Sequence, residues 1–125
     1  MDTGDVMRIH ESAENYLEAI LALSKQGPVR SIDVAQHLGV SKPSVSRAMG
    51  LLRENGYVSV DDTGHLVLTA SGRQIAASMY ERHTLLTRWL VSLGVSEAVA
   101  AEDACKIEHD LSPETFEAIK RHVGP

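Results

Sequence analysis

The sequence predicts a mainly α-helical fold with a small β-hairpin, organised as a winged helix-turn-helix followed by a second helical lobe. Apolar residues recur at helical spacing over most of the chain, whereas residues 57–68 are rich in β-branched residues and contain a turn-forming stretch. The hydrophobic fraction is 43% and the aromatic fraction only 4%, which suits helices packed through Leu, Ala, Val and Ile. Together these observations favour a helical protein in which one hairpin forms the wing.

The length of 125 residues is that of one domain, or of two small lobes sharing a core. The single cysteine excludes an intramolecular disulfide, so nothing indicates an oxidising compartment. No apolar run approaches the roughly 20 residues of a membrane span, and the start, Met1-Asp2-Thr3-Gly4-Asp5, does not have the pattern of a signal peptide. We therefore expect a soluble cytoplasmic protein with no membrane partner.

The first helix is expected from His10 to Lys25, and Gln26-Gly27-Pro28 ends it. One face of this helix is apolar and would be buried: Tyr16, Leu17, Ile20, Leu21 and Leu23. Another face carries polar residues spaced i, i+3, i+4 and i+7: Glu11, Glu14, Asn15 and Glu18. Carboxylates on one helix face are usually solvated, but this face is also a candidate half of a metal site.

Residues 31–54 have the pattern of a helix-turn-helix. Ser31 is expected to cap the first short helix, Gly39 to take the positive φ that ends it, and Ser41 to cap the second helix. Pro43 is tolerated in the first turn of the second helix, because its missing N–H would have no partner there. The alternative is an ordinary helical hairpin, which the combined pattern disfavours.

The second helix of this pair has a polar outer face near its N-terminus, formed by Ser41, Lys42, Ser44 and Arg47. Hydroxyls and cations suit contacts with the phosphates and base edges of double-stranded DNA. The net charge of the chain is -5, yet basic residues outnumber acidic ones between residues 22 and 57. A locally basic segment in an acidic protein fits DNA binding that depends on bound cations, because these cancel carboxylates.

The wing is predicted from two β-rich segments, Tyr57–Val60 and Leu66–Leu68. Between them lie the turn-forming residues Asp61-Asp62-Thr63-Gly64. The acidic tip of this hairpin argues against a strong phosphate contact by the wing.

Three further helices are expected, from about Ala70 to Leu93, from about Glu97 to Asp110 and from Ser112 to about His122. We therefore divide the chain into a winged helix-turn-helix DNA-binding domain at residues 1–70 and a helical domain at residues 71–125. The second domain is too small to bury its apolar faces alone, so we expect a homodimer formed through the C-terminal helices. Such a dimer would read a palindromic operator.

A thiol, a carboxylate and an imidazole share one helix face, because Cys105, Glu108 and His109 are spaced i, i+3 and i+4. They would form a metal-ligand set of mixed softness. The alternative is an amphipathic helix with a buried cysteine and two solvated polar residues. His83 falls on the apolar face of the preceding helix, where a lone histidine is more often a satisfied core residue than a ligand.

Over nearly its whole length the chain resembles the diphtheria-toxin-repressor and manganese-transport-repressor family of metal-dependent transcriptional repressors. The resemblance rests on the element order and on two segments, Tyr80-Glu81-Arg82-His83 and Glu102-Asp103-Ala104-Cys105-Lys106-Ile107-Glu108-His109 with the following Leu111-Ser112. It implies a helical metal-binding and dimerisation domain, and a homodimer that binds operator DNA and represses metal-uptake genes when Fe(II) or Mn(II) is abundant. We expect the short, manganese-type architecture without an SH3-like third domain.

The resemblance implies metal ligands at Glu18, His83, Glu108 and His109. Cys105 occupies a position that is glutamate in the manganese repressors and cysteine in the iron repressors, and Asn15 occupies one that is aspartate or methionine, respectively. The implied site is a hybrid in which the thiol favours Fe(II) over Mn(II), with one or two ions per subunit. The resemblance also implies major-groove contacts by Ser41, Pro43, Ser44 and Arg47, with Lys42 beside them.

Alternatives come from other classes of protein. A winged-helix regulator that senses a small organic ligand, or none, would place a hydrophobic pocket in the second lobe and leave Cys105, Glu108 and His109 incidental. A metalloenzyme would need further catalytic groups, and the sequence has no His-Glu-x-x-His motif, so we expect no enzymatic activity. Redox sensing by Cys105 lacks a resolving cysteine.

Overall fold

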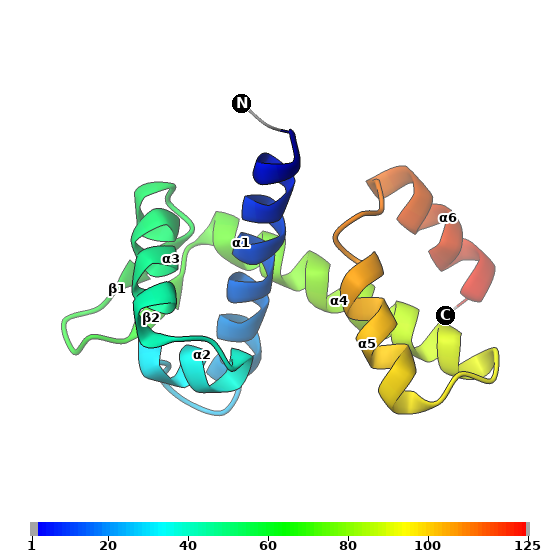
Figure 1. Ribbon diagram of the computed structural model, residues 1–125, viewed down its shortest axis with the longest axis horizontal. Helices are drawn as coiled ribbons and strands as arrows, with labels where there is room; N and C mark the ends of the chain where they lie inside the picture. Colours follow the sequence, from blue (N-terminus) through cyan, green and yellow to red (C-terminus); the bar gives the residue numbers. More distant parts are fainter. Residues whose placement is uncertain (1–2, 125) are drawn as a thin grey trace. The chain divides into compact units, whose positions relative to one another are not determined.

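The computed structural model describes the backbone of residues 3–124 and the side chains of residues 12–124 (Figure 1). The elements follow in the order α1 (Thr3–Ser24), α2 (Ser31–Leu38), α3 (Lys42–Glu54), β1 (Val58–Val60), β2 (Leu66–Leu68), α4 (Ala70–Ser92), α5 (Glu97–Ile107) and α6 (Pro113–Val123). The chain divides into two compact units, Met1–Ala77 and Ser78–Pro125. The predicted boundary between residues 70 and 71 stays a prediction, because α4 continues through both positions.

The first unit is a winged helix-turn-helix, and its turn between α2 and α3 forms as predicted. Gly39 ends α2 with φ +66°, a left-handed conformation that glycine adopts without strain. The Ser41 hydroxyl then accepts a hydrogen bond from the Ser44 N–H at 3.3 Å, and Pro43 lies in the first turn of α3. This capping fixes where the helix that carries the polar face begins.

The predicted cap of α2 is wrong by one residue. Ser31 is the first residue of the helix, and Arg30 occupies the cap position. The Asp33 carboxylate accepts a hydrogen bond from the Arg30 N–H at 2.9 Å, and this contact replaces a serine cap. The Asp33 side chain, which lies inside the helix, therefore determines where α2 begins.

The hairpin pairs β1 with β2 in antiparallel register, with Val58 opposite Leu68 and Val60 opposite Leu66. Its tip is held by Asp61, whose carboxylate accepts hydrogen bonds from the Thr63 N–H, the Thr63 hydroxyl and the His65 N–H at 2.8–2.9 Å. The His65 N–H, followed by the Thr63 hydroxyl, lowers the pKa of Asp61 below its ordinary value. The Asp61 carboxylate thus stabilises the turn at the tip of the hairpin.

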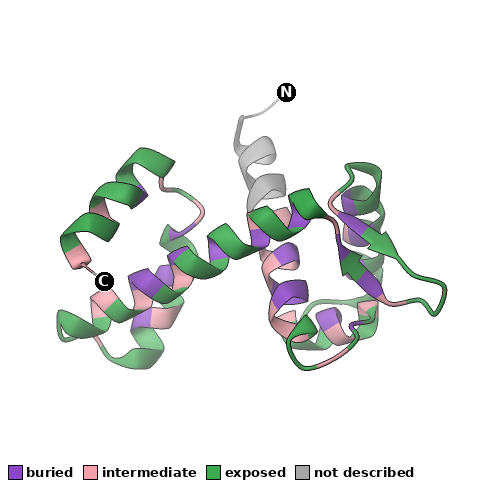
Figure 2. Cartoon of the chain, turned by 180° about the vertical axis from the view of Figure 1, so that it is seen from behind, coloured by how far each residue is buried: buried purple, intermediate pink, exposed green. Residues whose placement is uncertain are grey.

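The buried residues of the first unit, coloured purple along the ribbon in Figure 2, form one apolar cluster that joins α1, α2, α3 and the hairpin. Its most deeply buried large members are Leu17, Ile20, Val29, Val34 and Val45. The start of α4 closes against the hairpin through Gly72, where an added Cβ would lie 2.0 Å from the Tyr57 carbonyl oxygen. The Thr69 hydroxyl reinforces this junction by donating to the Gly56 carbonyl oxygen at 2.6 Å.

The second unit is formed by the C-terminal part of α4 with α5 and α6. Its buried apolar side chains are Met79, Leu85, Leu86, Ala100, Ala104 and Phe116. Ser96 and Ser112 cap α5 and α6 by accepting from the N–H groups of Val99 and Thr115, as sequence pattern predicts for the start of each helix. An ion pair of 2.6 Å between Lys120 and Glu81 joins α6 to α4.

Two predicted helix boundaries are wrong. The first helix begins at Thr3 rather than at His10, since no proline interrupts the intervening residues. The fifth helix ends at Ile107 rather than at Asp110, so Glu108 and His109 lie in the following turn. Within residues 3–124, no helix combines the length and the apolar character that crossing a membrane requires.

Candidate metal centre and DNA-binding surface

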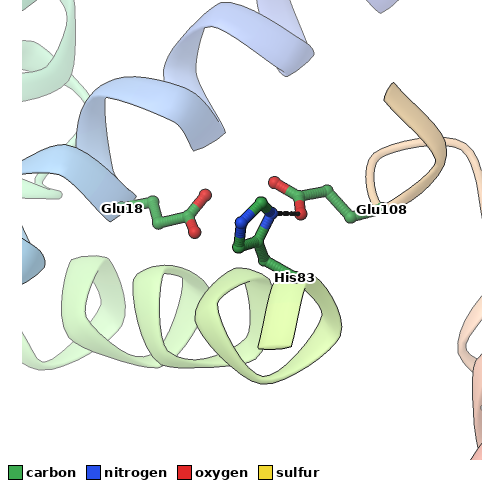
Figure 3. Close-up of side chains that lie close together, drawn as sticks. All are labelled: Glu18, His83 and Glu108. Atoms are coloured by element: carbon green, nitrogen blue, oxygen red, sulfur yellow. Dashed lines mark hydrogen bonds and ion pairs between the residues drawn. The ribbon is translucent and has the colours of Figure 1, made fainter. Parts of the chain in front are cut away.

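The second unit brings a histidine of α4 together with a glutamate from the turn after α5. The Nδ1 atom of His83 lies 3.0 Å from Oε2 of Glu108, and Figure 3 marks this contact with a dashed line. The Glu108 side chain is fully buried, whereas the His83 side chain is 32% exposed. One ligand-bearing group therefore lies in the protein interior, while its imidazole partner reaches the surface.

His109 contributes a second imidazole on the other oxygen of the same carboxylate. Its Nε2 atom lies 3.5 Å from Oε1 of Glu108, and its side chain is only 3% exposed. A buried carboxylate is unfavourable unless positive charge or hydrogen-bond donors compensate it. Carboxylate and imidazole groups are ligands that Mn(II), Fe(II) and Zn(II) accept, so the donor set fits a divalent transition metal.

Cys105 lies in the last turn of α5 and is exposed. His83 and Glu108 offer ligand atoms that lie within 4.8 Å of each other. Among the described residues of the second unit, Cys105 and His109 do not belong to this group. The structure therefore places the predicted thiol outside the group that includes the His83–Glu108 pair. The roles of Cys105 and His109 as ligands stay predictions.

Glu18 and Asn15 lie on α1 in the first unit, and both are half-buried. Their spacing of three residues within a helix puts them on one face, as the sequence predicted. Their roles as metal ligands stay predictions.

The five predicted DNA-facing residues all lie at the cap or in the first turns of α3, and all are exposed: Ser41, Lys42, Pro43, Ser44 and Arg47. The hydroxyls of Ser41 and Ser44 share a hydrogen bond of 2.7 Å. This contact orders both side chains at the start of the helix. The polar surface therefore has the predicted position, and its contacts with DNA stay predictions.

A basic residue beside the wing was not identified from the sequence. The Arg30 Nη1 atom lies 3.2 Å from the position that a Cβ on Gly64 would take. Arg30 thus brings a cation to a hairpin tip that the sequence shows only as acidic, with Asp61 and Asp62. Sequence reasoning missed this proximity because Arg30 precedes α2 and is far from the hairpin along the chain.

Both parts of the chain match models of one family. Residues 8–66 match the N-terminal DNA-binding domain of the iron-dependent repressors, and residues 69–125 match their metal-binding and dimerisation domain. This chain belongs to the iron-dependent repressor family. The family includes the diphtheria-toxin and manganese-transport repressors, so the predicted resemblance is confirmed, and its members are transcriptional repressors.

Individual members of the iron-dependent repressor family are similar to this chain in sequence and in structure. The transcriptional regulator MntR of Escherichia coli O6:H1 is 35% identical over 111 residues, which are 88% of this chain and 72% of that protein. A solved manganese-dependent transcriptional repressor in complex with manganese has a TM-score of 0.82 at 32% identity, over 90% of this chain and 52% of its own. The manganese regulator SloR has a TM-score of 0.81 at 27% identity, over 89% and 53%. This chain therefore spans about half the length of these solved structures.

Proposed function

We propose that this chain is a metal-dependent transcriptional repressor that binds a palindromic operator as a homodimer in the cytoplasm. Fe(II) or Mn(II) is the corepressor, and the regulated genes serve metal uptake. The observation that carries the proposal is the buried Glu108 carboxylate between the imidazoles of His83 and His109. The same chain contains a winged helix-turn-helix with an exposed polar face at the start of α3.

The proposed ligands of the second unit are His83, Glu108 and His109, with Cys105 as an additional thiol. From the family resemblance, Glu18 of the first unit completes the set, and Asn15 is a weaker candidate. The thiol shifts the preference toward Fe(II), because soft ligands favour later metals than Mn(II). Either one or two ions per subunit are compatible with this set.

The switch depends on carboxylates that precede and follow the DNA-binding motif in the chain. Glu18 lies before α2 and α3 in the chain, and Glu108 lies after them. A bound divalent cation supplies positive charge that offsets the carboxylates. His83 and His109 supply imidazole nitrogens for the same site. A coupling of about 1–3 kcal/mol between metal and DNA binding is enough for a useful switch.

The test is an anaerobic DNA-binding titration with a palindromic operator from upstream of a metal-transporter gene. Chelator, Mn(II), Fe(II) and Zn(II) are compared at fixed ionic strength, because salt alone changes such affinities by orders of magnitude. Tighter binding with metal, lost in Glu108→Gln and retained in the exposed α5 control Glu102→Gln, supports the proposal. Equal DNA affinity with and without metal would refute it.

One observation favours the alternative of a regulator that senses a small organic ligand. The first unit has a groove of about 910 Å³ between α1 and α3, lined by apolar residues such as Tyr16, Leu51 and Ile75 and also by Arg47. Its size is within the range of small-molecule sites. This groove lies in the first unit, whereas the sequence-based alternative expected a pocket in the second. Normal regulation in Glu108→Gln, together with loss of regulation in Leu51→Asp, would favour it.

A further inference from the structure

Arg82 is a buried cation directly before His83 on α4, with 7% of its surface exposed. Its Nη1 atom donates hydrogen bonds to the main-chain carbonyl oxygens of Glu108, at 2.9 Å, and Leu111, at 2.6 Å. Its Cζ atom lies 5.2 Å from the centre of the Phe116 ring, a cation–π distance. One side chain of α4 therefore binds both ends of the turn that carries Glu108 and His109.

These carbonyl groups lie outside the helices and need a donor from another element, because Glu108 is the C-cap residue of α5 and Leu111 precedes the cap of α6. The last carbonyls of an α-helix have no partner within it, and α5 ends at Ile107, one residue before Glu108. Arg82 supplies that donor, and its positive charge also suits the negative end of the helix. The guanidinium contacts main-chain oxygens, so it holds the turn without using the Glu108 carboxylate.

Stability alone does not account for this residue. Within the described part of the chain, the buried Nε atom of Arg82 has no hydrogen-bond partner. A buried charge with an unsatisfied donor is often no more favourable than an apolar residue of similar volume. Both hydrogen bonds that the Arg82 side chain donates go to the turn beside the candidate metal ligands.

We propose that Arg82 is a positioning residue for the metal site, an inference that rests on the proposed function. Arg82 fixes the turn of residues 108–111 against α4, and thereby holds Glu108 and His109 in a set relation to His83, the next residue after Arg82. Metal affinity and ligand geometry depend on this relation. Substituting a residue that orients metal ligands typically lowers metal affinity by about 10–100-fold.

The test is a Co(II) titration of the full chain by absorption spectroscopy, with affinity measured by chelator competition. Arg82→Met removes the donors and keeps an apolar stem over Phe116. We expect its Co(II) affinity to fall by about 10–100-fold and its ligand-field spectrum to change. Arg82→Lys keeps a cation without the planar fork, and we expect an intermediate affinity. Arg88→Met, an exposed arginine on the same helix, is the matched control and should behave as the wild type.

Phe116→Leu separates positioning from stability. This variant loses the cation–π contact but keeps both carbonyl bonds, so we expect a lower melting temperature with unchanged Co(II) affinity and spectrum. Folded Arg82→Met with wild-type affinity and spectrum overturns the inference. If Arg82→Met fails to fold, the Co(II) affinity and spectrum of Arg82→Lys test the inference instead, and wild-type values for both overturn it.

The inference and the proposed function fail in different ways. If wild-type Co(II) binding is lost in Glu108→Gln but unaffected by Arg82 substitution, only the role of Arg82 is overturned. If the wild type and Glu108→Gln take up Co(II) identically, the metal site at Glu108 is refuted, and the positioning role with it.

Discussion

The Nδ1 atom of His83 lies 3.0 Å from a carboxylate oxygen of Glu108, although 25 residues separate them in sequence. The glutamate is fully buried and the histidine is about one-third exposed. Removing His83 should therefore disturb the core little, while it removes a group that a cation would use.

We predict that His83→Gln abolishes most of the stabilisation of the protein by metal. At a free metal concentration 100 times the Kd, binding stabilises the wild type by about 2.7 kcal/mol, and this gain should vanish. Thermal unfolding with and without Mn(II) or Fe(II) measures the difference. The exposed His37→Gln on α2 is the control and should keep the full effect. A wild-type metal response in His83→Gln would contradict the prediction.

Substituting alanine for two glycines, Gly72 at the junction between α4 and the hairpin and Gly50 on α3, should have opposite effects on stability. In Gly72→Ala the new Cβ would lie 2.0 Å from the Tyr57 carbonyl oxygen, so the backbone must shift, at a cost of about 1–3 kcal/mol or more. Gly50 on α3 is exposed, and a Cβ there meets nothing within 4 Å. We expect Gly50→Ala to stabilise the chain by about 0.5–1 kcal/mol. Urea unfolding tests both, and a stabilising Gly72→Ala would show that this packing is wrong.

On the DNA surface, we predict that Arg47→Ala weakens operator binding. Arg47 is exposed in the first half of α3, whereas the exposed Arg53 lies in its last turn. If Arg47 contacts a base, Arg47→Ala should weaken binding by about 1–3 kcal/mol. If Arg47 contacts a phosphate, the variant should instead reduce the salt dependence of binding, with a slope smaller by about one. Titrations at several salt concentrations distinguish these two outcomes. The prediction fails if Arg53→Ala weakens binding as much as Arg47→Ala does.

The wing should lose order in acid because of Asp61. Three hydrogen bonds to its carboxylate hold the tip, and they lower the pKa of Asp61 from 3.8. A folded-state pKa below the unfolded value means that the stabilisation is present above about pH 4 and is lost as pH falls through the folded pKa. NMR titration of the Thr63 and His65 amides measures this, and Asp61→Asn should shift both amides at neutral pH. Asp62→Asn is the control, and equal shifts in both variants would contradict the assignment.

The thiol of Cys105 should set metal selectivity if it is a ligand. We predict that Cys105→Ser lowers the affinity for Fe(II) and Zn(II) more than that for Mn(II), because thiolate favours later metals. Competition binding under anaerobic conditions measures the three affinities. An equal change for all three metals would mean that the exposed Cys105 makes no bond to the ion.

Sequence patterns were sufficient for the fold class. Turn and cap chemistry is local, so Gly39, Ser41, Ser96 and Ser112 act in the structure as the sequence indicates. The hairpin also forms between the two predicted β-rich segments, and the structure pairs Val58 with Leu68 and Val60 with Leu66. The exposed polar face of α3 also follows from local spacing, because residues on the outside of a short helix are determined by its apolar stripe.

The metal site could be predicted only in part. Spacing within a helix placed Cys105, Glu108 and His109 on one face, but α5 ends at Ile107, so Glu108 is its C-cap residue and His109 lies in the turn beyond. The thiol is exposed and the carboxylate is buried, although Glu108 keeps helical dihedral angles and donates its N–H to the Ala104 carbonyl oxygen. Sequence spacing does not reveal a helix end when a side chain from another helix binds the turn that follows it.

The sequence by itself determined the winged helix-turn-helix, the order of the elements and the residue types available for a metal, because these depend on contacts between near neighbours in the chain. Only the tertiary structure decided where α5 ends, that Glu108 is buried against His83, and that Arg82 binds the carbonyl oxygens of Glu108 and Leu111. Those contacts join residues 25 to 29 positions apart. Their formation depends on the packing of α4 against the turn after α5, which no local pattern specifies.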